Sequence, residues 1–332
     1  MTKVEAARQE YIDWCTAVGV SNLESLNFFL ESGRGIELIN LCEARQERKY
    51  AQLADQIYWK KNKARIVLMS GPSSSGKTSS SLRIAQQCRV LGLNPKVVEL
   101  DNYFVDRSRT PKDENGNFDF ECLEAIDTEL LQRHFSELLE GREVIIPRFD
   151  FHDGRSIQDD ESRRLRLEDS DILFMEGIHA LNPELLGNVD PANTFRIYIS
   201  SLSALPGGEK VHNSTTDKRL LRRIVRDSRT RGHNAESTIL QWPSVRRGEE
   251  LYIFPYEENA DCVFNSSTLY DVPLLGYYAS PLLLEIAESS PAYEKAQTLL
   301  GFIDKVRLLT PREIAAIPPV SIMREFIGGQ ML

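Results

Sequence analysis

Cysteine is scarce in this chain and is not arranged for metal binding or redox chemistry. The five cysteines among 332 residues are widely separated, and no two form the CxxC pair that zinc sites and dithiol motifs use. No histidine stands near any of them at zinc-ligand spacing. We therefore expect reduced thiols, most of them packed in the interior, at Cys15, Cys42, Cys88, Cys122 and Cys262.

Long apolar runs and an excess of positive charge are also missing. No apolar run approaches the ~18 residues needed to cross a bilayer, and the N-terminus MTKVEAARQE lacks the basic and then apolar pattern of an export signal. The net charge of −9 disfavours a general nucleic-acid binder, because phosphate backbones are held by a surplus of Lys and Arg. These features predict a cytoplasmic protein with no membrane contact, and they make nucleic acid an unfavourable partner.

Short apolar runs alternate with helical stretches through the middle of the chain. Strands are expected at 65–70, 96–100, 143–146, 172–175 and 195–199, and a further strand is compatible with 261–264. Helical stretches such as 127–139 separate them. This alternation predicts an α/β fold of three layers, with a mainly parallel sheet between helices. We find no internal repeat and no low-complexity segment.

Both ends of the chain are predicted to be additions to this α/β region. The N-terminal part is helical in pattern, with a break at 32–35, and the C-terminal part holds one helix at 293–309 before the Pro318-Pro319 pair. The expected division is a helical extension at 1–62, an α/β domain at 63–266, and a C-terminal extension at 267–332 packed on that domain.

One motif in the sequence predicts a phosphate-binding loop. Gly71-Pro72-Ser73-Ser74-Ser75-Gly76-Lys77-Thr78 directly follows the first expected strand, and a helix is expected from Lys77. In such a loop successive backbone N–H groups converge on phosphate oxygens, and the helix dipole adds to their attraction. A chance match is the alternative, which the strand before and the helix after disfavour. The nucleotide-binding residues are predicted to be Gly71, Ser73, Ser74, Ser75, Gly76, Lys77, Thr78 and Ser79.

Within this loop two side chains have separate predicted roles. Lys77 would bridge the β- and γ-phosphates of a bound triphosphate, and Thr78 would hold Mg²⁺. The sequence therefore predicts ATP and Mg²⁺ as cofactors, although composition alone does not distinguish ATP from GTP.

Two carboxylates end apolar strands and are candidates for chemistry beside the phosphates. Asp101 follows the strand at 96–100, and ligands gather at the carboxyl ends of strands in an open parallel sheet. Asp101 is predicted to orient and deprotonate an acceptor hydroxyl, or to hold the metal through water. Glu176 ends the run Asp171-Ile-Leu-Phe-Met-Glu176 and is predicted to reach the Mg²⁺ shell. A turn or cap aspartate and an ordinary strand end are the alternatives.

An arginine-rich helix is the one strongly basic stretch in this acidic chain. Arg219, Arg222, Arg223 and Arg226 lie along one side of a helix that ends near Arg231 and Gly232, with Leu and Ile side chains opposite. A solvated charged face is the alternative. We favour a lid at 216–233 whose arginines, chiefly Arg226 and Arg231, neutralise the transferring phosphoryl group.

Taken together and in order, these motifs resemble those of the uridine kinase and phosphoribulokinase group of P-loop kinases. The matching segments are GPSSSGKT, LDNYF, FDFE leading to AID, IPRFDF, LFMEGIHAL and RRIVRDSRTRG. The resemblance covers about 65–264 and implies phosphoryl transfer from ATP to the 5′-hydroxyl of a pyrimidine nucleoside. It also implies that Asp101 is the catalytic base, that Glu176 belongs to the Mg²⁺ site, and that Arg226 and Arg231 contact phosphate.

The same resemblance implies the residues of the acceptor pocket, where this sequence departs from uridine kinases. Glu121 stands in place of an aspartate on the sugar hydroxyls, and Phe149 replaces a tyrosine. Gly154 stands in place of a base-reading histidine, with His152 as a substitute, and His233 replaces an arginine after the lid's Arg-Gly. The expected acceptor-binding residues are Tyr103, Glu121, Phe149, Phe151, His152, Arg223, His233 and Gln241.

These departures leave the acceptor open. A nucleoside is the expected small-molecule partner; a sugar phosphate or another hydroxyl compound is the alternative with the same chemistry. A nucleotide-switched, RNA-associated regulator is the alternative from another class. Residues 317–329 and the helical N-terminus are similar to longer bacterial relatives that carry a region similar to the editing region of threonyl-tRNA synthetase. A homo-oligomer is compatible with the sequence.

Overall fold

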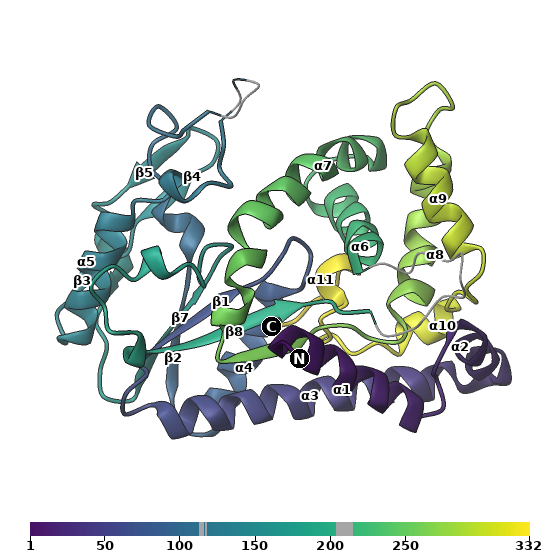
Figure 1. Ribbon diagram of the computed structural model, residues 1–332, viewed down its shortest axis with the longest axis horizontal. Helices are drawn as coiled ribbons and strands as arrows, with labels where there is room; N and C mark the ends of the chain where they lie inside the picture. Colours follow the sequence, from purple (N-terminus) through teal and green to yellow (C-terminus); the bar gives the residue numbers. More distant parts are fainter. Residues whose placement is uncertain (113–115, 117, 204–214) are drawn as a thin grey trace.

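The computed structural model describes residues 1–112, 116, 118–203 and 215–332, and its centre is a five-stranded parallel sheet (Figure 1). The strands of this sheet, in spatial order, are β2 (Asn94–Glu99), β7 (Asp171–Glu176), β1 (Ile66–Ser70), β8 (Thr194–Ser200) and β9 (Cys262–Asn265). Two antiparallel pairs lie outside it, β3 (Val144–Ile145) with β6 (Arg164–Leu165) and β4 (Arg148–Asp150) with β5 (Arg155–Ile157). The helices are α1 (Lys3–Ala17), α2 (Leu23–Phe29), α3 (Gly35–Lys60), α4 (Lys77–Val90), α5 (Thr128–Leu139), α6 (Thr215–Thr230), α7 (Ala235–Tyr252), α8 (Asp271–Leu284), α9 (Tyr293–Ile303), α10 (Pro311–Ala315) and α11 (Arg324–Ile327).

The central strands are apolar on both faces because helices cover both faces. All five residues of β1 and all six of β7 are buried, as expected for parallel strands enclosed between helical layers. One face packs on α5, where Leu131 and Phe135 meet Leu68 of β1. The other face packs on α3 and α4, where Ile57 and Ile84 meet strand residues such as Phe174. The predicted three-layer α/β/α architecture is confirmed.

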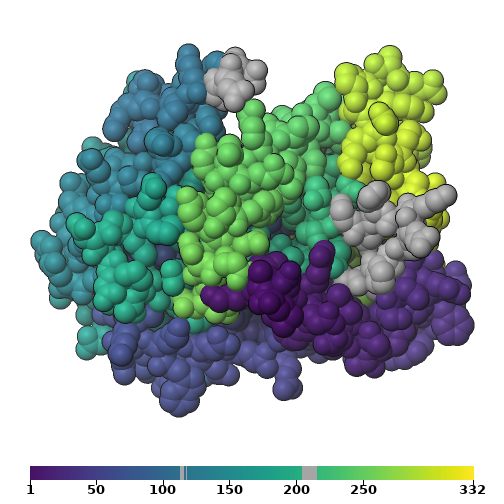
Figure 2. All heavy atoms as spheres, in the orientation of Figure 1, coloured from purple at the N-terminus to yellow at the C-terminus, as the bar shows by residue number. Residues whose placement is uncertain are grey.

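A second hydrophobic core joins the two ends of the chain. Side chains of α1 to α3, including Tyr11 and Leu38, pack in one cluster with the apolar face of α6 and with the C-terminal helices. Leu220 and Leu221 supply the α6 side of this cluster, and Phe326 of α11 belongs to it. In Figure 2 the purple N-terminal helices, the green helices and the yellow C-terminal helices lie against one another on the face shown. The helix predicted as a lid is thus held in place by both extensions.

The structure corrects some of the expected elements. The expected sheet strand at 143–146 is wrong as a member of the parallel sheet, because only Val144–Ile145 is extended and it pairs with β6 outside that sheet before Pro147. The helix expected at 293–309 ends at Ile303. The break expected at 32–35 is present as a kink at Gly33, whose φ of 79° suits glycine.

Two long helices were not expected. α7 contains Pro243, and α8 contains Pro273 and Pro281, so both carry residues that interrupt a helical pattern. Pro273 is accommodated in the first turn of α8, where a missing N–H costs no hydrogen bond. The five cysteines are free, and four of them are buried. In the described ranges no helix is long and apolar enough to span a membrane.

Candidate active site

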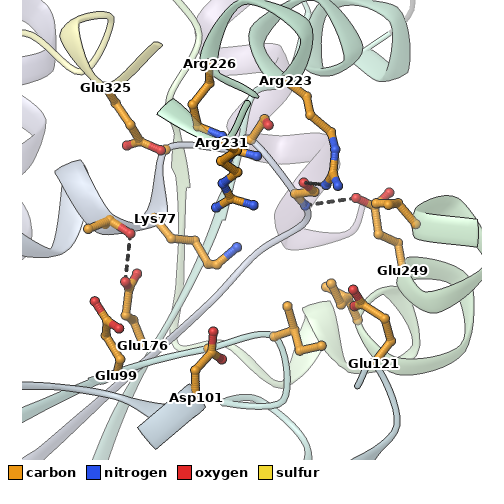
Figure 3. Close-up of a pocket in the computed structure, with 18 residues that line it drawn as sticks. Lys77, Glu99, Asp101, Glu121, Glu176, Arg223, Arg226, Arg231, Glu249 and Glu325 are labelled. Atoms are coloured by element: carbon orange, nitrogen blue, oxygen red, sulfur yellow. Dashed lines mark hydrogen bonds between the residues drawn. The ribbon is translucent and has the colours of Figure 1, made fainter. Parts of the chain in front are cut away.

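A cavity of about 350 Å³ opens where the central strands end. The P-loop after β1, the residues that follow β2 and the last residue of β7 all border it, because the carboxyl ends of parallel strands share one edge of the sheet. Helices α6 and α7 border it from the other side. Figure 3 shows Arg231, just after α6, pointing toward Lys77, while Arg223 and Glu249 lie beside each other near the P-loop. The lining residues are Ser73, Ser74, Gly76, Lys77, Thr78, Glu99, Asp101, Glu121, Glu176, Gly177, Ile178, Arg223, Arg226, Arg231, Val245, Glu249, Ile253 and Glu325.

The phosphate-binding loop has the backbone that its sequence predicts. Ser74 has a positive φ of 57° and Gly76 one of 84°, so the chain turns sharply before α4 begins at Lys77. Gly71 is needed for a different reason, since a Cβ there would lie 2.0 Å from the carbonyl oxygen of Ile199. This turn presents the N-terminus of α4 to the cavity, where an anion is favoured.

Lys77 lies in the cavity among carboxylates. Its Nζ donates to the Gly71 carbonyl at 2.8 Å. Burial lowers the pKa of Lys77, while the negative charges of Glu176, Glu325 and Asp101 act in the opposite direction. The loop supplies Lys77 with a carbonyl acceptor but no negative charge, so its ammonium is well suited to bind a phosphate anion.

Thr78 and Glu176 fit a hard divalent cation. The Thr78 hydroxyl donates to Oε1 of Glu176 at 2.7 Å, and Oε2 of Glu176 is buried without a hydrogen-bond partner. Burial raises the pKa of Glu176 to about 7, although the positive charge of Lys77 and the hydrogen bond from Thr78 act in the opposite direction. No group of three or more metal-binding side chains is found in the described residues. Mg²⁺ needs only one or two such ligands when phosphates and waters supply the rest.

Asp101 stands just after β2, within the cavity that Lys77 borders. Its side chain is exposed to the cavity opening, yet the surrounding walls desolvate the carboxylate and raise its pKa. The nearby Glu99 acts in the same direction, whereas Lys77 and Arg231 act against it. A carboxylate with a raised pKa is a more effective proton acceptor at neutral pH than an ordinary one.

The arginine run on α6 divides into two groups with different partners. Arg223, Arg226 and Arg231 border the cavity, and Arg223 donates to the Ser73 hydroxyl at 2.8 Å (Figure 3). Arg219 and Arg222 are 1% and 0% exposed and lie outside the cavity lining. A lid role is compatible with the first group, although all three of its arginines also pair with the buried carboxylate of Asp227. Arg219 and Arg222 pair with buried carboxylates on α7 and α8 and do not reach the cavity.

Glu249 is a residue of this site that the sequence did not indicate. It comes from α7 and accepts a hydrogen bond from the Ser73 N–H at 2.9 Å. Arg219 pairs with the same carboxylate and also donates to the Ser73 carbonyl at 3.1 Å. The backbone N–H and the carbonyl of Ser73 are thus both bonded to one buried ion pair, whose members come from α6 and α7. In the sequence Glu249 is an ordinary glutamate three residues after Arg246, with which it also pairs, so the sequence gives no signal of its contact with the P-loop.

Only two of the eight expected acceptor residues border the cavity. Glu121 and Arg223 do so, and burial raises the pKa of Glu121. Tyr103 is 1% exposed, with its hydroxyl 3.0 Å from Nδ1 of His134, so it faces the interior instead. The remaining residues, which do not line the cavity, are Phe149, Phe151, His152, His233 and Gln241.

An aromatic cluster lies close in sequence to Asp101 and Glu121, the two residues that border what we call the acceptor side of the cavity. Phe104, three residues after Asp101, makes edge-to-face contacts with Phe120, Phe149 and Phe151, with ring centroids 5.5 to 6.2 Å apart. Phe149 is buried in this cluster and Phe151 is 62% exposed. His152 is exposed beside Asp153, and His233 and Gln241 are exposed as well. The structure therefore does not bring these last three to the acceptor side.

His179 lies behind the site and yields a prediction about acid stability. It is 0% exposed, and burial lowers its pKa from 6.5 to about 4. Below pH 6.5 the unfolded chain binds a proton that the folded chain resists until about pH 4, so about 3 kcal/mol of stability is expected to be lost across that window.

Urea unfolding at pH 7 and at pH 4.5 measures this effect. His179→Leu should lose clearly less stability between the two pH values than the wild type. His152→Leu, which changes an exposed histidine, should behave as the wild type does. An unchanged pH dependence in His179→Leu would contradict the prediction.

Comparisons with known proteins agree with the fold and with the P-loop. The family model described as "Phosphoribulokinase / Uridine kinase family" matches residues 66–273. The chain is 30% identical to a uridine kinase of Halobacterium salinarum over 196 residues, which are 59% of this chain and 77% of that protein. It is 25% identical to a uridine kinase of Brevibacillus brevis over 199 residues, which are 60% of this chain and 83% of that protein.

A solved structure similar to this chain is a putative fructose transport system kinase from Silicibacter. It is 20% identical, has a TM-score of 0.45, and covers 65% of this chain and 98% of its own. The family match spans more than half of the chain and includes the P-loop, Asp101, Glu176 and the arginines of α6. The chain therefore belongs to the phosphoribulokinase / uridine kinase family of ATP-dependent kinases.

Proposed function

We propose that this kinase transfers the γ-phosphoryl group of ATP to the 5′-hydroxyl of a pyrimidine nucleoside, uridine or cytidine. The observation that carries the proposal is the single cavity in which Asp101 shares space with Lys77 and with the arginines of α6. A carboxylate with a raised pKa beside cationic phosphate partners is what transfer to a hydroxyl requires. The uridine kinase relatives support the choice of acceptor.

In the proposed reaction the acceptor hydroxyl lies against Asp101. Its oxygen forms a bond to the γ-phosphorus while the bond to the bridging oxygen of ADP breaks, and its proton passes to the Asp101 carboxylate. Lys77, Arg226 and Arg231 balance the negative charge on the γ-phosphate oxygens as the group moves. Glu249 and Arg219 hold the Ser73 peptide so that the loop keeps its shape.

Mg²⁺ is the proposed metal cofactor, and Thr78 and Glu176 are the residues that would hold it. When bound, it would neutralise charge on the β- and γ-phosphates. The Glu176 oxygen without a hydrogen-bond partner supports this assignment.

The charge of the acceptor side favours an uncharged acceptor. Asp101 and Glu121 both border this side, and Arg223 is already bonded to the Ser73 hydroxyl. Carboxylates accept hydrogen bonds from sugar hydroxyls but repel a second phosphate, so a nucleoside fits better than a sugar phosphate. The exposed ring of Phe151 near Phe104 is a surface on which a base can stack.

A coupled assay of ADP release over a panel of acceptors tests the proposal. Uridine or cytidine should raise turnover well above the rate with ATP alone, and ribulose 5-phosphate should not. Turnover with the sugar phosphate only would overturn the nucleoside assignment in favour of the other acceptor. No acceptor-dependent turnover together with salt-dependent RNA binding would favour a nucleotide-switched regulator instead.

A further inference from the structure

The C-terminal segment 321–330 lies directly on the nucleotide-binding loop. Ile322 is buried against Gly76, where a Cβ would come within 2.4 Å of its side chain. Phe326 of α11 is fully buried, and the guanidinium of Arg222 lies 5.0 Å from its ring centroid. A part of the chain outside the family match thus forms one wall of the site.

Glu325 in this segment holds the first turn of α4. Its Oε2 accepts a hydrogen bond from the Ser79 N–H at 3.3 Å and another from the Ser79 hydroxyl. Gln330 donates to the same hydroxyl at 2.7 Å. Figure 3 shows the Glu325 carboxylate entering the cavity from the side opposite Glu176, near Lys77.

The Glu325 carboxylate occupies the position in which a phosphate group of a bound nucleotide is expected. In a P-loop the backbone N–H groups at the start of the helix cradle the α- and β-phosphates. Ser79 follows Thr78 in that first turn, so its N–H is one of these donors. The partial positive charge of the helix N-terminus attracts a carboxylate and a phosphate alike. Glu325 and the α-phosphate therefore compete for one donor, and their like charges repel each other.

Other hydrogen bonds hold the segment in place and do not involve the Glu325 carboxylate. Arg324 donates to the carbonyl of Ile317 at 2.5 Å and to that of Pro318 at 3.4 Å. Arg229 donates to the Phe326 carbonyl at 3.3 Å and packs over Gly328, whose φ is 87°. The carboxylate of Glu325 can therefore lose its partner without loss of the fold of the segment.

We propose that segment 321–330 is an intramolecular competitor of the nucleotide, with Glu325 in the place of the α-phosphate. ATP binds by displacing this carboxylate from Ser79, and the segment lowers the affinity of the site for any nucleotide that carries an α-phosphate. The proposal rests on ATP binding and not on the acceptor, so it stands or falls independently of the nucleoside assignment.

Calorimetric titration of the full chain and of Glu325→Gln tests this competition. The glutamine keeps the size and one acceptor oxygen but removes the charge. The dissociation constants of ATP, ADP and AMP should each fall by about tenfold, within the range usual for coupled sites. That of adenosine, which carries no phosphate, should not change.

Glu288→Gln is the matched control, because it removes an equal charge from an exposed residue beyond α8. It should leave all four constants unchanged. Unchanged or weaker ATP binding in Glu325→Gln would overturn the proposal, since it would make Glu325 neutral or helpful to the nucleotide. An equal gain in affinity for adenosine would also overturn it, because the effect would then not depend on the phosphate groups.

Discussion

Asp101→Asn is expected to lower kcat by about 10²- to 10⁴-fold, the usual contribution of a positioned general base. The amide has nearly the size of the carboxylate but cannot accept the hydroxyl proton. ATP affinity should remain within about twofold of the wild type, because Lys77 and the α4 N-terminus, and not Asp101, are the proposed phosphate-binding groups. The effect should therefore appear in kcat with little change in the KM of ATP.

Single-turnover kinetics combined with ATP titration separates these quantities. Asp159→Asn, which makes the same change at an exposed aspartate outside the cavity lining, should retain wild-type kinetics. A large loss of ATP affinity in Asp101→Asn, with turnover preserved at saturating ATP, would contradict the role as base. It would indicate instead that Asp101 holds the metal, the alternative that its sequence position also allows.

The sequence was sufficient to predict that the P-loop, Asp101 and Glu176 meet at one edge of the sheet, because their positions depend on local structure. The P-loop needs only one strand, one turn and one helix, and all three are encoded within 66–90. Asp101 and Glu176 were located by a general rule, that parallel strands expose their carboxyl ends at one edge. The two residues could therefore be placed at the same edge of the sheet although they lie far apart in the sequence.

The division of the arginines could not be predicted in the same way. Arg219, Arg222, Arg223 and Arg226 repeat at helical spacing, and their pattern is the same whether they face a ligand or a buried carboxylate. What separates them is the position of Glu249 and other acidic residues on later helices. Those contacts depend on how α7 and α8 pack, and the prolines in these helices obscured even their existence.

The acceptor side and segment 321–330 were hardest to predict because both are made by long-range packing. The acceptor residues were carried over from a family resemblance, and His152 stands in the exposed turn between β4 and β5, outside the cavity lining. Glu325 comes from a segment with no periodic pattern, and its contact with Ser79 spans most of the chain. Neither composition nor spacing carries information on such a contact.

Asp271→Ala is expected to be the most destabilising of the substitutions considered for this chain. Asp271 is 1% exposed at the start of α8 and pairs with two buried cations, Arg222 at 2.8 Å and Lys218 at 3.3 Å. Burial already lowers the pKa of Lys218 to about 8, against the effect of Asp271. Without this carboxylate both cations remain buried and uncompensated, a situation that costs about 3–5 kcal/mol.

Urea unfolding should show this loss, while Asp304→Ala at an exposed aspartate should change stability by less than about 0.5 kcal/mol. Adding Lys218→Met to Asp271→Ala should recover part of the loss, because it removes one buried charge and leaves an apolar chain of similar length. Full stability in Asp271→Ala alone would mean that α6 is not anchored through Arg222. The assignment of Arg222 to the anchoring group would then be wrong.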